Sequence, residues 1–193
     1  SSLSVTHPKV AAEWHPSKNG NTTPSDVKGG SGKKVWWQCP KGDDHEWETR
    51  IADRSRGIGC PFCSGHKASV TNSLATQFPD LAAQWHLTKN GKVTPSDVVT
   101  GSDKKAWWKC PVADDHEWQT TLNNRTRGTN CPFCSGKKPS STNSLAARFP
   151  EIAKQWHPTK NGSLTPDQIP AGSEKRHWWK CLKGPDHEWQ TAP

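Results

Sequence analysis

Apolar side chains are sparse in this chain and return at regular places. The clearest helical pattern places apolar residues three or four positions apart, at Leu74, Phe78, Leu81 and Trp85. That spacing is typical of one buried helical face. Ser73 is a suitable N-cap, and Pro79 suits the first turn of a second helix, with Asp80 near the positive end of its dipole. We therefore predict two short helices between residues 73 and 85.

Two strand patterns follow, after polar turn sequences at residues 89–91 and 94–97. The basic segment 104–110 predicts a strand that ends at a cysteine. From Glu117 the pattern alternates, and we predict a β-hairpin that returns through Arg125–Gly128 to Cys131. Strand side chains alternate between faces. The inward set is therefore expected to be Trp118, Thr120 and Leu122, and the outward set Gln119, Thr121 and Asn123.

The whole arrangement repeats with a period of 71 residues and no gap, so that Trp14 matches Trp85 and Trp156. A fixed period of this kind marks an array of one supersecondary unit. We predict three modules joined by short Ser/Lys-rich linkers. The modules are residues 1–66, 67–137 and 138–193, with linkers at 65–71 and 136–142, and the third module lacks its second cysteine pair.

All seven cysteines belong to the repeat. Two repeats each carry three cysteines and one histidine at the same spacing, and the third carries half of that set. Thiolates with an imidazole select zinc over other common metals, and the Cys-Pro-Phe-Cys turn lets two thiolates reach one ion. We expect one Zn²⁺ per complete repeat. The predicted ligands are Cys39, His45, Cys60 and Cys63, then Cys110, His116, Cys131 and Cys134, and the half-site Cys181 and His187.

Two alternatives to these ligand sets bear on the prediction. A disulfide framework is disfavoured because the cysteine count is odd and the spacing is that of a metal knuckle. The rival histidines are His15, His86 and His157, which also recur, but they lie far from the cysteines in sequence. His66 is a poor ligand candidate because Lys137 replaces it in the second repeat.

The composition agrees with small metal-stabilised modules. Only 30% of the residues are hydrophobic, and the chain has 12 Trp but no Tyr or Met. Units this small rarely bury enough apolar surface to fold unaided. We expect Trp to supply much of each core, with Trp37, Trp108 and Trp179, or else their Trp neighbours, buried. The alternative is exposed Trp that stacks on unpaired bases.

A formal net charge of +8 and a pI near 9.2 favour a polyanionic partner. Several cations recur at one place in successive repeats, which would form a stripe suited to phosphates. The alternative is an ordinary solvated basic surface. The predicted phosphate-facing residues are Lys33, Lys34, Arg54, Arg56, Lys104, Lys105, Arg125, Arg127, Lys175 and Arg176.

The outward strand residues differ between repeats while the inward ones are kept. Glu48, Arg50 and Ala52 in the first repeat stand where the second has Gln119, Thr121 and Asn123. Arg, Gln and Asn make bidentate contacts with base edges. We therefore predict that this strand faces a DNA groove, and surface drift is the alternative. The predicted base-facing residues are Arg50, Gln119, Thr121, Asn123 and Gln190.

The chain also resembles a known family. The motif Trp-Trp-x-Cys-Pro, Asp-His-Glu-Trp, then Arg-x-Arg-Gly-x-x-Cys-Pro-Phe-Cys is similar to a zinc-ribbon (treble-clef-like) repeat family of unknown function. The preceding segment 144–162 is similar too. The resemblance implies small α+β zinc-stabilised modules with short helices and a zinc-ribbon or treble-clef-like β-hairpin. It also implies arrays attached to nuclease-like domains and suspected of binding DNA.

Together these patterns predict an array that binds double-stranded DNA as the targeting part of a larger protein. A protein-interaction array and a single-stranded nucleic acid or RNA binder are the alternatives. We expect no enzyme activity, because four protein ligands close the zinc site. We also expect a monomeric array without a small-molecule substrate. Thiolate zinc sites predict a reducing compartment, the cytoplasm or nucleus, and no apolar run is long enough to span a membrane.

Overall fold

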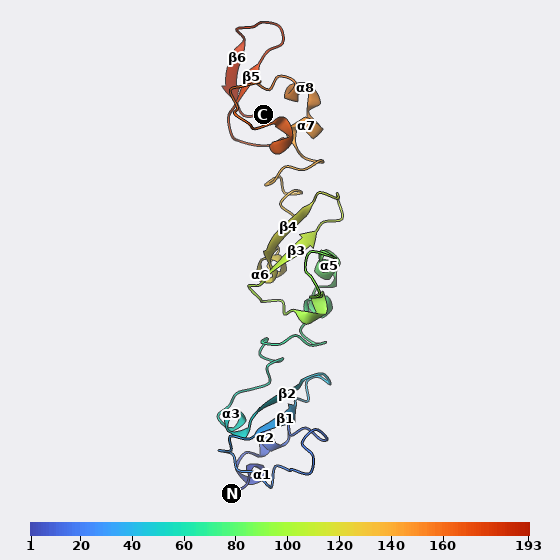
Figure 1. Ribbon diagram of the computed structural model, residues 1–193, viewed down its shortest axis with the longest axis vertical. Helices are drawn as coiled ribbons and strands as arrows, with labels where there is room; N and C mark the ends of the chain where they lie inside the picture. The colour runs from blue at the N-terminus through green and yellow to red at the C-terminus, as the bar shows by residue number, and fades with distance from the viewer. The chain divides into compact units, whose positions relative to one another are not determined.

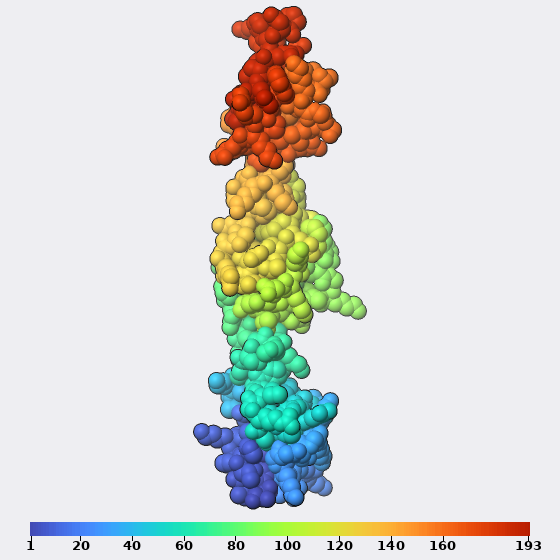
Figure 2. Space-filling model, turned by 90° about the vertical axis from the view of Figure 1, so that its left-hand side faces the viewer, coloured from blue at the N-terminus to red at the C-terminus, as the bar shows by residue number.

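The computed structural model describes all of residues 1–193, and the chain divides into two compact units. The first unit contains Ser1–Ala83 and Gly91–Asp103, and the second contains Gln84–Asn90 and Lys104–Pro193. The course of the chain can be followed by colour in Figures 1 and 2.

The first repeat builds a small core between a helix pair and a two-stranded sheet (Figure 1). Its elements are α1 (Leu3–Thr6), α2 (Pro8–Ala11), β1 (Lys34–Gln38), β2 (Glu46–Arg50) and α3 (Ile51–Ser55). β1 and β2 are antiparallel, and Trp37 pairs with Trp47 across them. Both indoles face inward, as strand alternation requires. The buried cluster is Leu3, Val35, Trp37, Cys39, Trp47, Ile51, Cys60 and Phe62.

Residues 13–15 lie along the edge of β1 that β2 does not occupy, and the loop 16–33 follows them. The amide of His15 donates to the Trp36 carbonyl at 3.1 Å, and the Gln38 amide donates to the Glu13 carbonyl at 2.8 Å. Trp14 meets Trp37 edge to face, with ring centroids 5.4 Å apart. The arrangement ties the helix pair to the hairpin through a tryptophan contact.

The rest of the first unit holds the next helix pair, α4 (Leu74–Gln77) and α5 (Pro79–Ala82), with the 3-10 turn η1 (Pro95–Asp97). The predicted helices are confirmed: the Ser73 side chain accepts the Thr76 amide as an N-cap, and Pro79 opens α5. Leu74 is fully buried, and its amide donates to the Val98 carbonyl at 2.9 Å.

The second unit repeats the same elements. They are β3 (Lys105–Lys109), β4 (Glu117–Thr121), α6 (Leu122–Thr126), α7 (Leu145–Arg148), α8 (Pro150–Ala153), η2 (Pro166–Gln168), β5 (His177–Lys180) and β6 (Glu188–Thr191). Each sheet is a separate antiparallel pair, β3 with β4 and β5 with β6. Trp108 and Trp179 are buried, as expected, and Leu145, Ile169 and Trp179 form a small core cluster.

The structure corrects the predicted hairpin. The two strands flank the Cys110–His116 loop, so the hairpin lies earlier in the sequence than expected. The residues after β4 turn into the short helix α6, because Thr121 caps it by accepting the Asn124 amide at 3.1 Å. Asn123 therefore lies in α6. Its counterpart Ala52 lies in α3 and is buried, so it does not face outward.

No helix in the structure has the length and apolar character that a bilayer-crossing segment needs.

The two tryptophans of a Trp pair should differ sharply in their contribution to stability. Trp37 is fully buried and donates its indole N–H to the Thr49 carbonyl at 3.2 Å, whereas Trp36 is partly exposed. Trp37→Ala should cost about 3–5 kcal/mol in the first repeat, as for other large aromatic truncations. Trp36→Ala is the matched control and should cost clearly less. Hydrogen exchange of the β2 amides measures both, and equal losses would contradict the assigned core.

Candidate functional site

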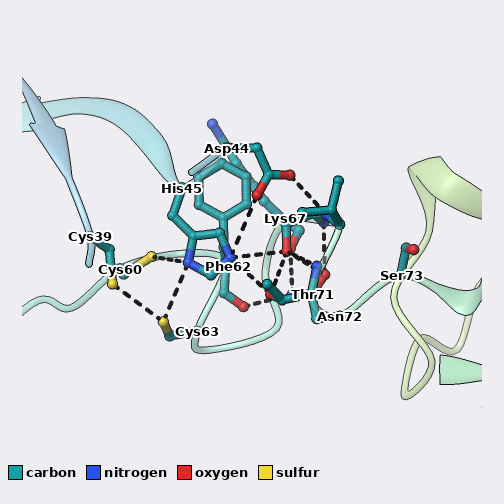
Figure 3. Close-up of polar contacts among 12 residues, drawn as sticks. Cys39, Asp44, His45, Cys60, Phe62, Cys63, Lys67, Thr71, Asn72 and Ser73 are labelled. Carbon is teal, nitrogen blue, oxygen red and sulfur yellow. Dashed lines mark hydrogen bonds and ion pairs between the residues drawn. The ribbon is translucent and has the colours of Figure 1, made fainter. Parts of the chain in front are cut away.

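Four ligand atoms from three parts of the first repeat converge (Figure 3). Cys39 follows β1, His45 precedes β2, and the Cys60–Cys63 knuckle follows α3. The Cys39 and Cys63 sulfurs are 3.6 Å apart, and the His45 Nδ1 atom lies 3.7 Å from the Cys60 sulfur and 3.6 Å from the Cys63 sulfur. A tetrahedral zinc with metal–sulfur bonds of about 2.3 Å holds its sulfurs about 3.8 Å apart. The four side chains therefore fit one Zn²⁺.

The second repeat brings its ligand set together in the same way. The Cys110 and Cys134 sulfurs are 3.7 Å apart, and His116 Nδ1 lies 3.8 Å from the Cys131 sulfur and 3.6 Å from the Cys134 sulfur. In both sites the four ligand atoms lie within 4.8 Å of one another. The predicted ligands of both complete repeats are thus placed together, as Cys₃His sites suited to zinc.

One thiol in each complete site has a raised pKa. Burial raises the pKa of Cys63 to about 12, with hydrogen bonding to Cys39 and Cys60 adding to the shift. Burial likewise raises the pKa of Cys134 to about 12. Zinc binds thiolates, so metal binding in these sites releases protons. A bound ion would supply the positive charge that lets three thiolates lie close together.

The third repeat does not assemble a comparable set. Cys181 is partly exposed, and the side chain of His187 is 58% exposed. The structure brings three or more ligand groups together only in the two complete repeats. The half-site therefore offers two ligands.

The rival histidines have structural roles away from the thiols. His15 Nδ1 accepts the backbone amides of Ser17 and Lys18 at 3.2 Å, so its Nε2 carries the proton and donates to Glu46 at 2.9 Å. His157 Nε2 makes the same contact with Glu188 at 2.9 Å, and His86 Nε2 lies 3.0 Å from Glu117. His66 is exposed and bonds to Ser64 at 2.8 Å. The preference for His45 over these residues is consistent with the geometry.

The lysines three residues after these histidines also make contacts within their own repeats. Lys18 pairs with Glu46 and lies over the Trp36 ring, 4.7 Å from its centroid. The ammonium group, followed by the His15 ring, lowers the pKa of Glu46. In the third repeat Lys160 and His157 lower the pKa of Glu188 to about 2. The outer Trp of each pair therefore has a lysine ammonium over one of its ring faces.

Two predicted phosphate contacts are wrong. Arg54 and Arg125 are 6% and 3% exposed, and each guanidinium lies between two tryptophan rings. Arg54 also pairs with Glu13, and Arg125 donates to Gln84 at 2.8 Å. A cation enclosed in this way cannot reach a phosphate. The two arginines instead fasten α3 and α6 to their sheets.

The other predicted nucleic-acid contacts divide by exposure. Thr121 caps α6, and Asn123 is partly buried. In the first sheet Lys34 lies directly opposite Arg50 on the outward face. The exposed residues are Lys33, Lys34, Arg50, Arg56, Lys104, Lys105, Gln119, Arg127, Lys175, Arg176 and Gln190.

A cleft of about 440 Å³ adjoins β4 in the second unit. Its lining includes Gln119 from β4, Asn130, and Lys137 and Lys138, which follow the knuckle in the sequence. The sequence did not indicate that Lys137 and Lys138 line the same cleft as Gln119. The proximity arises because the knuckle folds back beside the strand, which no local pattern indicates.

Sequence reasoning also missed the hydroxyl residues that contact the metal-site histidines. Ser69 and Thr71 lie 3.0 and 2.9 Å from His45 Nε2, although both fall in or beside a predicted linker. The available signal was that Ser-x-Thr-Asn at 69–72 recurs at 140–143.

Comparison with family models identifies the class. The model described as "Probable Treble clef zinc finger domain" matches residues 10–66, 81–137 and 152–193. The matches cover most of the chain, so the protein belongs to this treble clef zinc finger family and carries three copies of its domain. The comparison with curated proteins gives no match.

We predict two zinc ions per chain. Native mass spectrometry of the zinc-loaded protein should show two bound ions, and Cys63→Ser should lower that number to one because the first site loses a thiolate. Cys181→Ser is the control and should leave two ions bound. A third ion that is lost in the Cys181→Ser variant would contradict the two-site assignment.

Proposed function

We propose that the three zinc modules form an array that binds double-stranded DNA through the outward faces of their hairpins. Support comes from exposed cations at equivalent positions, Lys34, Lys105 and Arg176, of which the first two lie on hairpins that also carry zinc ligands. The net charge of +8 has the sign that a phosphate backbone requires. In this proposal the zinc ions are structural and the array carries no catalytic step.

The proposal rests on one observation. Lysines that can contact phosphates lie on the same sheet face as Arg or Gln side chains that can contact base edges. In the first sheet Lys34 stands opposite Arg50, and in the second Lys105 stands opposite Thr121 with Gln119 two residues along β4. Cations on phosphates fix the register, and side chains such as Gln and Arg read base edges. Arg54, Arg125 and Asn123 have no part in the revised interface.

The cleft beside β4 gives the second repeat a more cationic edge than the first. Gln119, Thr129 and Lys137 line the cleft. The first repeat has Glu48, Ile58 and His66 at the matching positions. An acidic side chain repels phosphates, and an additional lysine attracts them. The second repeat is therefore the stronger contributor to DNA affinity in this proposal.

The covered tryptophans weigh against the single-strand alternative. The outer Trp rings lie under Lys18, Lys89 and Lys160, with ammonium-to-centroid distances of 4.7, 4.8 and 4.6 Å. Stacking of a base on that ring face would require each lysine to leave both the ring and its glutamate. A protein partner remains the alternative that the binding measurement below separates from DNA.

Removing paired cations should lower duplex affinity in a salt-dependent way. Lys34→Gln/Arg50→Gln should reduce the salt slope of binding to a random duplex by about one, for the lost phosphate contact of Lys34, and should relax sequence preference where Arg50 reads a base. Lys9→Gln/Lys28→Gln removes the same charge from exposed positions elsewhere in the first repeat and should change the slope less. Fluorescence anisotropy at several salt concentrations measures both. Absence of duplex binding at low salt would overturn the proposal and favour a protein partner.

Gln119 and Lys137 should affect DNA binding differently. Gln119→Ala should relax sequence preference at one position, since a base-reading contact is worth about 1–3 kcal/mol. Lys137→Gln should weaken all duplexes about equally, because a phosphate contact carries no sequence information. Selection from a random duplex library, followed by sequencing, distinguishes the two. Equal weakening by Gln119→Ala on every sequence would assign Gln119 to the backbone.

A further inference from the structure

The zinc-ligand histidine of each complete repeat contacts residues that lead into the next helix pair. His45 Nε2 lies 3.0 Å from Ser69 Oγ and 2.9 Å from Thr71 Oγ1. In the second repeat His116 Nε2 lies 3.0 Å from both Ser140 Oγ and Thr142 Oγ1. The contact is thus made twice with the same residue types.

The direction of the bond follows from the ligand set. His45 Nδ1 faces the sulfurs, so Nε2 carries the ring proton when Nδ1 binds zinc and must donate it (Figure 3). Hydroxyl oxygens accept it. A hydrogen bond of this kind fixes the tautomer and orientation of a metal-bound imidazole and raises its basicity. Ser69 and Thr71 are therefore positioning residues for the ligand.

Asn72 fastens the same segment to the zinc knuckle. Its side-chain amide donates to the Phe62 carbonyl at 2.7 Å and to the Lys67 carbonyl at 2.9 Å. Its Oδ1 accepts the Ser69 amide at 2.8 Å. Phe62 lies between the two knuckle cysteines, and its ring stacks on His45 with centroids 5.0 Å apart. The segment, the knuckle and the histidine form one closed network (Figure 3).

A further bond joins the segment to the loop that carries the histidine. The Val70 amide donates to Asp44 Oδ2 at 2.8 Å. In the second repeat the Ser141 amide donates to Asp115 Oδ2 at 2.6 Å, and this bond lowers the pKa of Asp115. Because Asp44 immediately precedes His45, the segment contacts the histidine loop through both backbone and side chain.

The network ends where the next helix begins. Ser73 follows Asn72 and caps α4, and Ser144 follows Asn143 and caps α7. Ser69 and Ser140 are buried, at 5% and 8% exposure. A buried hydroxyl that loses its partner is costly. These segments are thus closely held and do not behave as open linkers.

We infer that Ser69–Asn72 and Ser140–Asn143 are latches that couple zinc binding in one repeat to the position of the following helix cap. Zinc fixes the imidazole, the imidazole holds the hydroxyl pair, and the pair with its asparagine sets the residue that starts the helix. Coupling of this kind is reciprocal, so loosening a latch weakens zinc binding by the same factor that zinc tightens the latch. The inference rests on the zinc sites and is independent of the DNA proposal.

The experiment uses the full chain with Ser69→Ala/Thr71→Val, which keeps side-chain size and removes both acceptors. Chelator competition should show zinc affinity at the first site lowered about 10–100-fold, the range for loss of such outer contacts. Cadmium NMR, in which each site gives its own resonance, assigns the loss to one site. Ser140→Ala/Thr142→Val is the matched control and should weaken the second site alone.

Hydrogen exchange reports directly on whether the latch is held in place. Chelating zinc from the native chain should speed hydrogen exchange at the Val70 and Leu74 amides, and the double variant should show fast exchange at Val70 even when zinc is bound. The conservative variant Ser69→Thr/Thr71→Ser keeps both hydroxyls and should restore most of the affinity.

Two outcomes would overturn the inference. Unchanged zinc affinity with unchanged exchange would mean that the hydroxyls do not act on the site. Equal weakening of both sites by either double variant would indicate general loss of structure and not a local latch.

Discussion

The convergence of four ligands from three chain segments is the constraint on which each repeat depends. The end of β1, the residue before β2 and the knuckle after α3 meet within 4.8 Å, and Cys39 and Cys60 lie at the same time in the small apolar core of the repeat. The core of the first repeat is a few side chains around Trp37 and Trp47. Zinc coordination supplies the missing stabilisation, as in other metal-dependent small domains, so the hairpin and the knuckle hold their positions as one body.

The tryptophan–arginine packing is the second constraint, and it changes the meaning of the positive charge. Arg54 and Arg125 lie between indole rings and bond to Glu13 and Gln84, so they act as core residues with polar ends. The Ile58 carbonyl accepts from Arg54 and the Thr129 carbonyl from Arg125. These carbonyls, the facing side chain and the ring faces replace part of the water around each guanidinium, whose Nε has no partner. Two of the positive charges of this chain, on Arg54 and Arg125, therefore stabilise the fold and are not available to a partner.

The sequence predicted the metal ligands and the capped helices well, because both depend on local spacing. Ser73 and Pro79 lie at their expected helix positions, and Cys39, His45, Cys60 and Cys63 come together. The hairpin was misplaced because α6 is only five residues long and has too few apolar positions to show a helical period. The contacts of Ser69 and Thr71 were missed because they join residues 24 and 26 positions away, beyond any local pattern.

Repetition alone is a weak guide to the binding surface in an array like this. Residues recur both when they hold the scaffold and when they meet a repeated ligand. Asn19, for example, recurs because its side chain bonds the amide and the carbonyl of Trp36 at 2.8 and 2.9 Å. Other positions are exposed and differ between repeats. Glu48 on β2 and Gln119 on β4, which occupy equivalent positions, are an example. If successive modules distinguish successive stretches of a partner, these exposed positions carry the difference, because scaffold residues such as Asn19 return unchanged as Asn90 and Asn161.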